Sequence, residues 1–124
     1  MKLRIHGDSI RLRLSRSEVA EFGERGRVED SVHFGRGAAL VYALESAPDS
    51  GSARAVFDNG AIRIIVPALA ARQWAITDEV GITGEQALDD HGRLTIVIEK
   101  DFQCAHKPGD QDEDTFPNPL AAGN

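Results

Sequence analysis

The sequence predicts an α+β domain built on a mostly antiparallel sheet. Stretches that alternate apolar and polar residues dominate the chain, and only two stretches have helical features. The alternating stretches predict about six or seven strands in an open or barrel-like sheet, since short turns join consecutive strands. Together with two short helices, the predicted element order is β-β-α-β-β-β-β-α-β. We find no internal repeat along the chain.

The first two predicted strands form a hairpin with one apolar and one basic side. Residues 2–6 and 10–14 alternate between aliphatic and mostly basic side chains, and the residues "GDS" between them are typical of a turn. Because alternate side chains of a strand point to opposite faces, the basic residues share one side.

Two helices follow from capping and turn residues. Ser15 and Glu18 have the spacing of a capping box, in which each side chain accepts a hydrogen bond from the other residue's backbone N–H. Gly23 or Gly26 is suited to the left-handed residue that ends this helix of about two turns. Pro67 fits the first turn of the second helix, since its missing N–H is not needed there.

The remaining strands are predicted from alternation and β-branched residues. Asn59 and Gly60 separate two alternating runs and predict a hairpin with a tight primed turn. Residues 78–92 read as loop, with at most a brief strand at 80–82. The other predicted strands cover residues 28–34, 38–47 and 93–102.

Length and charge limit the classes of function. At 124 residues the chain is one domain, which we place at residues 1–103, followed by an acidic, proline-containing tail at residues 104–124. A net charge of −6 argues against a nucleic-acid binder, and no apolar run is long enough to span a membrane. One cysteine and no signal peptide predict a cytoplasmic protein.

Arginines on the polar side of the predicted strands are the main candidate site. Arg4, Arg11, Arg13 and Arg63 all alternate with apolar residues, so a common face would be strongly cationic. Guanidinium groups bind phosphate and carboxylate through paired hydrogen bonds, which predicts an anion-binding face. The alternative is a solvated face whose ion pairs contribute little.

The tail offers a second candidate site. Cys104 and His106 have suitable side chains for a structural metal, but a zinc site needs three or four ligands and the chain has only one such close pair. The sequence therefore predicts no cofactor. Phe116 lies between acids and prolines and is expected to dock either on its own domain or on another copy.

Two resemblances bear on function. The stretches "IHGDSIRLRLSRSEV", "VGI", "IEKDF" with Cys104, and "FPNP" resemble a family of small bacterial proteins of unknown function, which implies a free-standing cytoplasmic domain. "SIRLRLS" is also similar to a strand of the triphosphate tunnel enzymes, whose barrel holds a triphosphate through a metal. This chain has "KLRIH" where those enzymes have alternating glutamates.

Three hypotheses of function result. The first is a non-enzymatic binding or adaptor domain, whose cationic face meets an anionic small molecule or an acidic protein segment; the tail is a route to a homo-oligomer. The second is a metal-dependent phosphate or phosphoester enzyme, with Glu45 and Glu99 holding a divalent ion. The third is a structural protein without a specific ligand.

Overall fold

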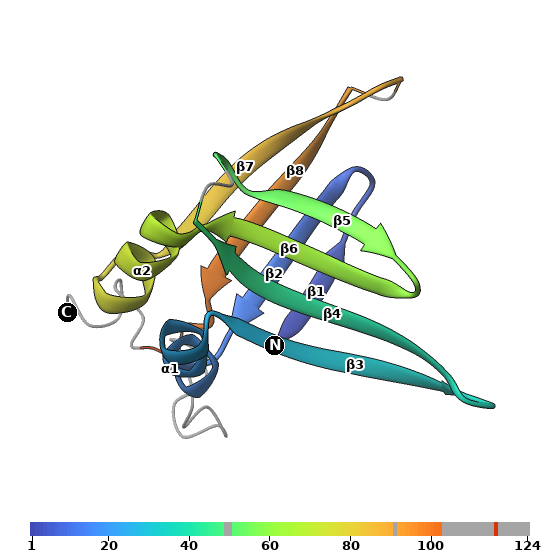
Figure 1. Ribbon diagram of the computed structural model, residues 1–124, viewed down its shortest axis with the longest axis horizontal. Coiled ribbons are helices and arrows are strands. Elements are labelled where there is room, and N and C mark those ends of the chain that lie inside the picture. The colour runs from blue at the N-terminus through green and yellow to red at the C-terminus, as the bar shows by residue number, and fades with distance from the viewer. Residues whose placement is uncertain (49–50, 91, 103–115, 117–124) are drawn as a thin grey trace.

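The chain folds into two four-stranded sheets that pack face to face, with two helices at one end (Figure 1). The computed structural model describes residues 1–48, 51–90, 92–102 and 116. The elements are β1 (Lys2–Ile5), β2 (Ser9–Leu14), α1 (Arg16–Arg25), β3 (Arg27–Gly35), β4 (Ala38–Ala47), β5 (Arg54–Asp58), β6 (Ala61–Pro67), α2 (Ala68–Ile76), β7 (Gly81–Leu88) and β8 (Gly92–Lys100).

Both sheets are mixed. Sheet A has the strand order β1-β2-β8-β7, and sheet B has the order β3-β4-β6-β5. In each sheet the two central strands, β2 with β8 and β4 with β6, are parallel, and the outer pairs are antiparallel hairpins. The α+β class is confirmed, and four of the six described strand pairings are antiparallel as predicted, but the strands form two open sheets rather than one. The helices carry the chain from one sheet to the other, so the hairpins before and after each helix lie in different sheets.

The local signals around the helices are confirmed. The Ser15 side chain accepts from the Glu18 N–H, the Glu18 carboxylate accepts from the Ser15 N–H, and α1 ends at Gly26 with φ 72°. Pro67 precedes α2 as its N-cap. Asn59 and Gly60 both have positive φ, as a primed hairpin turn requires.

β7 is the strand that the sequence reading missed. It spans eight residues and pairs with β8 from Gly81 opposite Glu99 to Leu88 opposite Gly92. Its inward positions include Gly84, where an added Cβ would lie 2.9 Å from the Cβ of Ala53, the residue directly before β5 of the other sheet. Close approach of the two sheets requires glycine there, and the apolar alternation is interrupted as a result.

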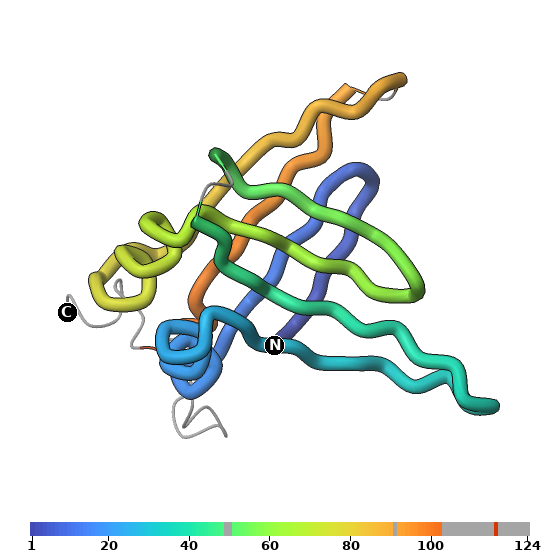
Figure 2. The backbone as a smooth tube through the Cα atoms, in the orientation of Figure 1, coloured from blue at the N-terminus to red at the C-terminus, as the bar shows by residue number. Residues whose placement is uncertain are grey.

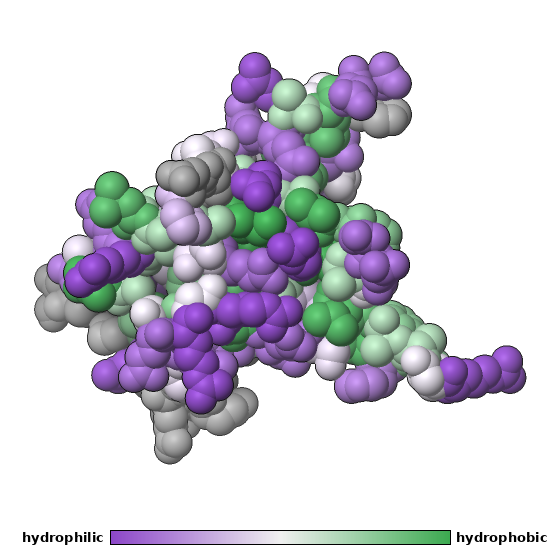
Figure 3. Space-filling view, viewed as in Figure 1, coloured by the Kyte–Doolittle hydropathy of each residue, from purple (hydrophilic) through white to green (hydrophobic). Residues whose placement is uncertain are grey.

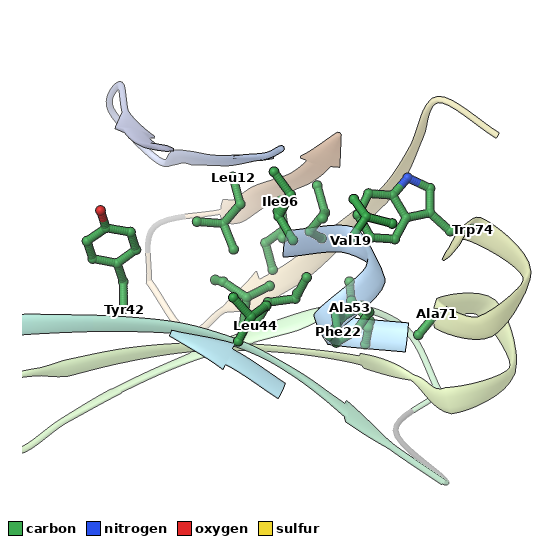
Figure 4. Packing of buried hydrophobic residues seen from close by; sticks show 14 of the residues in the cluster. Leu12, Val19, Phe22, Tyr42, Leu44, Ala53, Ala71, Trp74 and Ile96 are labelled. Atoms are coloured by element: carbon green, nitrogen blue, oxygen red, sulfur yellow. The ribbon is translucent and has the colours of Figure 1, made fainter. Parts of the chain in front are cut away.

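The core lies between the sheets and is closed at one end by the helices. Leu12 and Ile96 point from sheet A toward Leu44 of sheet B, and all three are fully buried (Figure 4). Phe22 of α1 meets Trp74 of α2 edge to face, with ring centroids 6.1 Å apart. Burial of such aromatic and aliphatic side chains supplies the main driving force for this fold.

The two halves of the chain have the same architecture. Each half consists of a hairpin, a helix and a second hairpin, and the first hairpin of one half pairs with the second hairpin of the other half in both sheets (Figure 2). Residues 10–22 correspond to residues 62–74, and residues 40–45 correspond to residues 94–99. The chain is thus an internal pseudo-dimer, and the prediction of no repeat was wrong.

Equivalent residues also meet each other where the two halves join. Phe22 corresponds to Trp74, and the two rings are in contact. The backbone bond from Ser46 N–H to Gly26 C=O (3.0 Å) has its counterpart in the bond from Lys100 N–H to Val80 C=O (3.1 Å). Few equivalent residues are identical, so the repeat is visible in hydrogen-bond register and topology rather than in the letters of the sequence.

Candidate functional site

The outer face of sheet A carries two pairs of cations on neighbouring strands. In the β1–β2 hairpin, Lys2 lies opposite Arg13 and Arg4 lies opposite Arg11. The intervening Leu12 and Leu14 are buried in the core, so the four cationic side chains lie on the outer side. We call these four residues the cationic face.

Two carboxylates partly neutralise this face. Glu99 Oε1 accepts from Arg13 Nε (3.1 Å) and Arg13 Nη2 (2.9 Å), and it lies 3.8 Å from Arg11 Nε. Asp101 Oδ2 is 3.1 Å from the ammonium of Lys2. Arg4 forms no salt bridge with any residue that the structure describes, and the Arg11 contact is too long for a hydrogen bond.

Two hollows meet at the Arg4–Arg11 pair. One has a volume of about 260 Å³ and is lined by Arg4, Arg11, His6 and Ser9. The other has a volume of about 180 Å³ and is lined by Lys2, Arg4, Arg11 and Arg13. The face is therefore concave where its guanidinium groups are least neutralised, and the first hollow adds an imidazole and a hydroxyl to the two guanidinium groups.

The arrangement is electrostatically unfavourable in the absence of an anion. Like charges placed directly opposite each other on neighbouring strands destabilise a sheet by a few tenths of a kcal/mol up to about 1 kcal/mol. Here two such pairs, Lys2 with Arg13 and Arg4 with Arg11, follow each other along one hairpin. Glu99 and Asp101 offset this repulsion for Arg13 and Lys2, so the Arg4–Arg11 pair is the one that reduces local stability.

Arg63 does not lie on the cationic face. It belongs to β6 of sheet B, where its neighbours Ile62 and Ile64 are buried in the core, so its side chain lies on the outer side of the other sheet. Arg63 Nη2 donates to Glu45 Oε1 (3.0 Å), and Arg27 Nε donates to Glu45 Oε2 (3.0 Å). Of the four predicted arginines, Arg4, Arg11 and Arg13 therefore share the outer face of sheet A, and Arg63 lies on the outer face of sheet B.

The carboxylate between Arg63 and Arg27 is strongly stabilised. The hydrogen bond from Arg63 holds the pKa of Glu45 below its ordinary value, and the bond from Arg27 acts in the same direction against the effect of burial. The hydrogen bond to Glu45 raises the pKa of Arg63, and hydrogen bonds to Glu29 and then to Glu45 raise the pKa of Arg27. Glu45 is therefore engaged as an acceptor on sheet B.

The geometry does not support a divalent-ion site at Glu45 and Glu99. The two carboxylates lie on the outer sides of different sheets, and each is bound by arginine. Within the described ranges, no group of three or more potential metal ligands occurs. The two sheets are open, and the buried space between them is aliphatic and aromatic, unlike the charged interior of a triphosphate tunnel.

The predicted metal ligands Cys104 and His106 lie outside the described residues. Of the tail, Phe116 is described and packs on its own domain: its N–H donates to Asp101 C=O (2.8 Å), and its ring lies 5.9 Å from that of Phe102. The first of the two alternatives for Phe116 is therefore the one observed.

Lys100 is a buried cation beneath this docked ring. Its Nζ donates to Thr77 C=O (2.7 Å) and lies 5.7 Å from the Trp74 ring centroid and 5.3 Å from that of Phe116. Desolvation lowers the pKa of Lys100, partly offset by Asp78 and Glu79. The ammonium is enclosed by rings and backbone, so we assign it a role in packing.

Comparison with known proteins places the chain in a family. Residues 1–120 match the family model described as "Family of unknown function (DUF7009)". The chain belongs to the DUF7009 family. This agrees with the expected family of unknown function. No curated protein and no solved structure matches the chain. None of its described helices has the length and apolar character needed to cross a membrane.

The sequence placed His6 on the same polar side as the arginines but did not assign it a role in anion binding, and it did not point to Ser9. These two residues flank the β1–β2 turn, where His6 N–H donates to Ser9 C=O (3.0 Å), and both line the larger hollow beside Arg4 and Arg11. The signal was available, since His6 is two residues after Arg4 and Ser9 two residues before Arg11, which puts all four on one side of the hairpin.

Proposed function

We propose that this chain is a non-enzymatic binding domain whose cationic face takes up a small oxyanion of the phosphate type. The observation that carries the proposal is the Arg4–Arg11 pair, two guanidinium groups on facing positions that share two hollows. Among the described residues Arg4 has no carboxylate partner, and Arg11 has only the 3.8 Å contact with Glu99. Guanidinium forks and a serine hydroxyl are suitable hydrogen-bond donors to such an anion.

Binding rather than turnover is proposed because the face lacks the parts of a phosphoryl-transfer site. Its two carboxylates, Glu99 and Asp101, are engaged by Arg13 and Lys2, so neither is positioned to hold an activating metal. The proposed ligand is small because a hollow of about 260 Å³ is below the usual size of a drug-sized pocket. The proposed setting is the bacterial cytoplasm.

The experiment is a titration of the purified chain with inorganic phosphate and pyrophosphate, followed by calorimetry and by thermal shift. We expect saturable binding that weakens with added salt, without any need for a divalent ion. Arg4→Gln and Arg11→Gln should each weaken binding roughly tenfold. The matched control is Arg63→Gln, which removes an arginine at the equivalent position of sheet B and should leave affinity unchanged.

A second candidate ligand for the cationic face is a carboxylate-rich segment, such as residues 110–114 of another copy. A synthetic peptide of that sequence is therefore added as a competitor. Displacement of phosphate by the peptide would assign the face to acidic segments, whereas phosphate binding insensitive to it would keep the small oxyanion. Absence of any response to phosphate, pyrophosphate and peptide would contradict the proposal and leave a structural domain without a ligand.

A further inference from the structure

The end of the molecule opposite the helices is open and apolar. The two sheets diverge there and leave a groove of about 490 Å³, lined almost entirely by aliphatic and aromatic side chains. Leu94 of sheet A, and Leu40 and Ile62 of sheet B, line this groove. Phe57 stands at its edge with 71% of its surface exposed. Ligand pockets are mostly apolar and have volumes of about 300–1,000 Å³, so this groove is a candidate binding site.

The β3–β4 hairpin extends beyond the body of the molecule and has an apolar side of its own (Figure 1). Val28 near the start of β3 is buried in the core, so Val32 lies on the same side of the strand, and Phe34 follows at the register irregularity between His33 and Gly35. Val32 and Phe34 are 42% and 68% exposed, because sheet A does not extend over this part of sheet B. Apolar atoms interrupt the hydrophilic surface toward this side of the molecule (Figure 3).

The groove and the apolar side of the hairpin form one continuous surface. Leu40 lines the groove, and it is also the cross-strand partner of Val32 in the hairpin. We call this surface the apolar mouth; it comprises Val32, Phe34, Leu40, Phe57, Ile62 and Leu94. Large contiguous apolar patches are uncommon on monomeric proteins and mark interaction surfaces.

Charges at the two ends of the apolar mouth are of opposite sign. The tip of the β3–β4 hairpin carries the exposed Arg36, at φ 56°. Around the groove lie Asp58 at the end of β5, and Asp89 and Asp90 in the β7–β8 turn, all of them exposed. None of these four side chains forms a salt bridge with a described residue, so a hairpin tip arriving from another molecule would meet complementary charge.

We propose that the apolar mouth binds a second copy of this chain, with the β3–β4 hairpin of each copy inserted into the groove of the other. Hairpin and groove are contiguous through Leu40, so one two-fold axis brings both contacts together and the assembly closes as a dimer. Phe34 would enter the groove beside Phe57 and Ile62, and Arg36 would approach Asp58. This proposal is independent of anion binding, because the cationic face lies on the outer side of sheet A.

The test is the mass of the full chain in solution, measured by sedimentation velocity and light scattering over a range of concentrations. We expect a dimer that dissociates on dilution. Phe34→Ser and Phe57→Ser should each raise the dissociation constant roughly tenfold or more. The matched control is Leu69→Ser: Leu69 is 80% exposed but lies on α2, at the other end of the molecule, so the dissociation constant should not change.

A charge exchange makes the test specific for the orientation. Arg36→Asp and Asp58→Arg should each weaken the dimer, and the double variant should recover most of the affinity. A wild-type chain that stays monomeric at every concentration overturns the proposal, and so does a dimer that none of these substitutions affects. A monomer that binds an apolar fluorescent dye through Phe57 also overturns it and assigns the groove to a small apolar ligand.

Discussion

The outer faces of the two sheets share a backbone arrangement but differ in how their arginines are satisfied. Arg11 of β2 and Arg63 of β6 occupy equivalent positions, each diagonal to a glutamate on the parallel neighbour strand. Arg63 donates to Glu45 at 3.0 Å and faces Val56 across the hairpin. Arg11 lies 3.8 Å from Glu99 and faces Arg4.

This difference teaches that the fold does not require the cationic face. Sheet B shows that the same register is compatible with an arginine paired to a carboxylate and facing an apolar side chain. Sheet A has the same register, but Arg4 stands at the position equivalent to Val56 of sheet B. Arg4 adds a charge that no described carboxylate neutralises. Residues that reduce local stability where the fold permits better ones are characteristic of binding sites.

The largest expected effect tests whether the two halves form one cooperative unit. Phe22→Ala and Trp74→Ala remove equivalent rings from the shared contact, and each should lower the free energy of unfolding by about 3–5 kcal/mol. Denaturant titrations followed by circular dichroism should show one transition for both variants. Two separate transitions would show that the halves unfold independently. The two outer faces could then not be compared as parts of one cooperative fold.

The next prediction concerns substitutions that exchange the residues by which the two faces differ. Arg4→Val removes the like-charge pair and should raise the free energy of unfolding by a few tenths to about 1 kcal/mol while weakening phosphate binding roughly tenfold, as Arg4→Gln should. Val56→Arg creates an Arg–Arg pair in sheet B and should lower stability by a similar amount. Thermal melts and calorimetry check both. A loss of stability in Arg4→Val would mean that Arg4 stabilises the hairpin.

A smaller effect concerns Lys100, whose equivalent in the first half is the uncharged Ser46. Because desolvation lowers its pKa, the folded chain binds fewer protons than the unfolded chain between the folded pKa and about 10.4. Stability should therefore rise with pH through that window. Lys100→Met should remove the rise and stabilise the chain at pH 7 by about 1 kcal/mol. Urea titrations at pH 7 and pH 10 measure this, and an unchanged pH slope would contradict it.

The smallest effect is the acid dependence of sheet B. Hydrogen bonding from Arg63 lowers the pKa of Glu45, so its stabilisation is fully present above the unfolded value of about 4.3 and is lost as pH falls through the folded pKa. Glu45→Gln should lower the melting temperature by about 2–4 °C at pH 7 and by less at pH 3. An equal decrease at both pH values would show that the carboxylate charge is not the cause.

Local structure was predictable from the sequence because its causes are local. The capping box at Ser15, the left-handed Gly26 and the primed turn at Asn59–Gly60 each depend on a few neighbouring residues. Alternation also identified the cationic side of the first hairpin. It could not assign Arg63 to a sheet, because alternation gives the side of a strand but not its neighbours.

The pairing of distant strands was not predictable. β2 pairs with β8 and β4 with β6 in parallel, and no local pattern distinguishes these partners from adjacent hairpins. The same limitation hid β7, where Gly84 packs against Ala53, directly before β5, and Gln86 accepts from the Ala55 N–H of β5. The repeat was hidden because burial and register can be kept by different apolar residues, as with Phe22 and Trp74.

The parallel pairing of β2 with β8 also determines when sheet A can be completed during synthesis. All strands of sheet B lie between Arg27 and Pro67, so this sheet can assemble while the ribosome is still translating the second half. The β1–β2 hairpin must wait for the end of the chain, with Leu12 and Leu14 in contact with solvent or a chaperone. Late closure between remote segments is slow and exposes apolar surface, so the inner sides of the amino-terminal hairpin and of sheet B stay open to aggregation until β7 and β8 have been made.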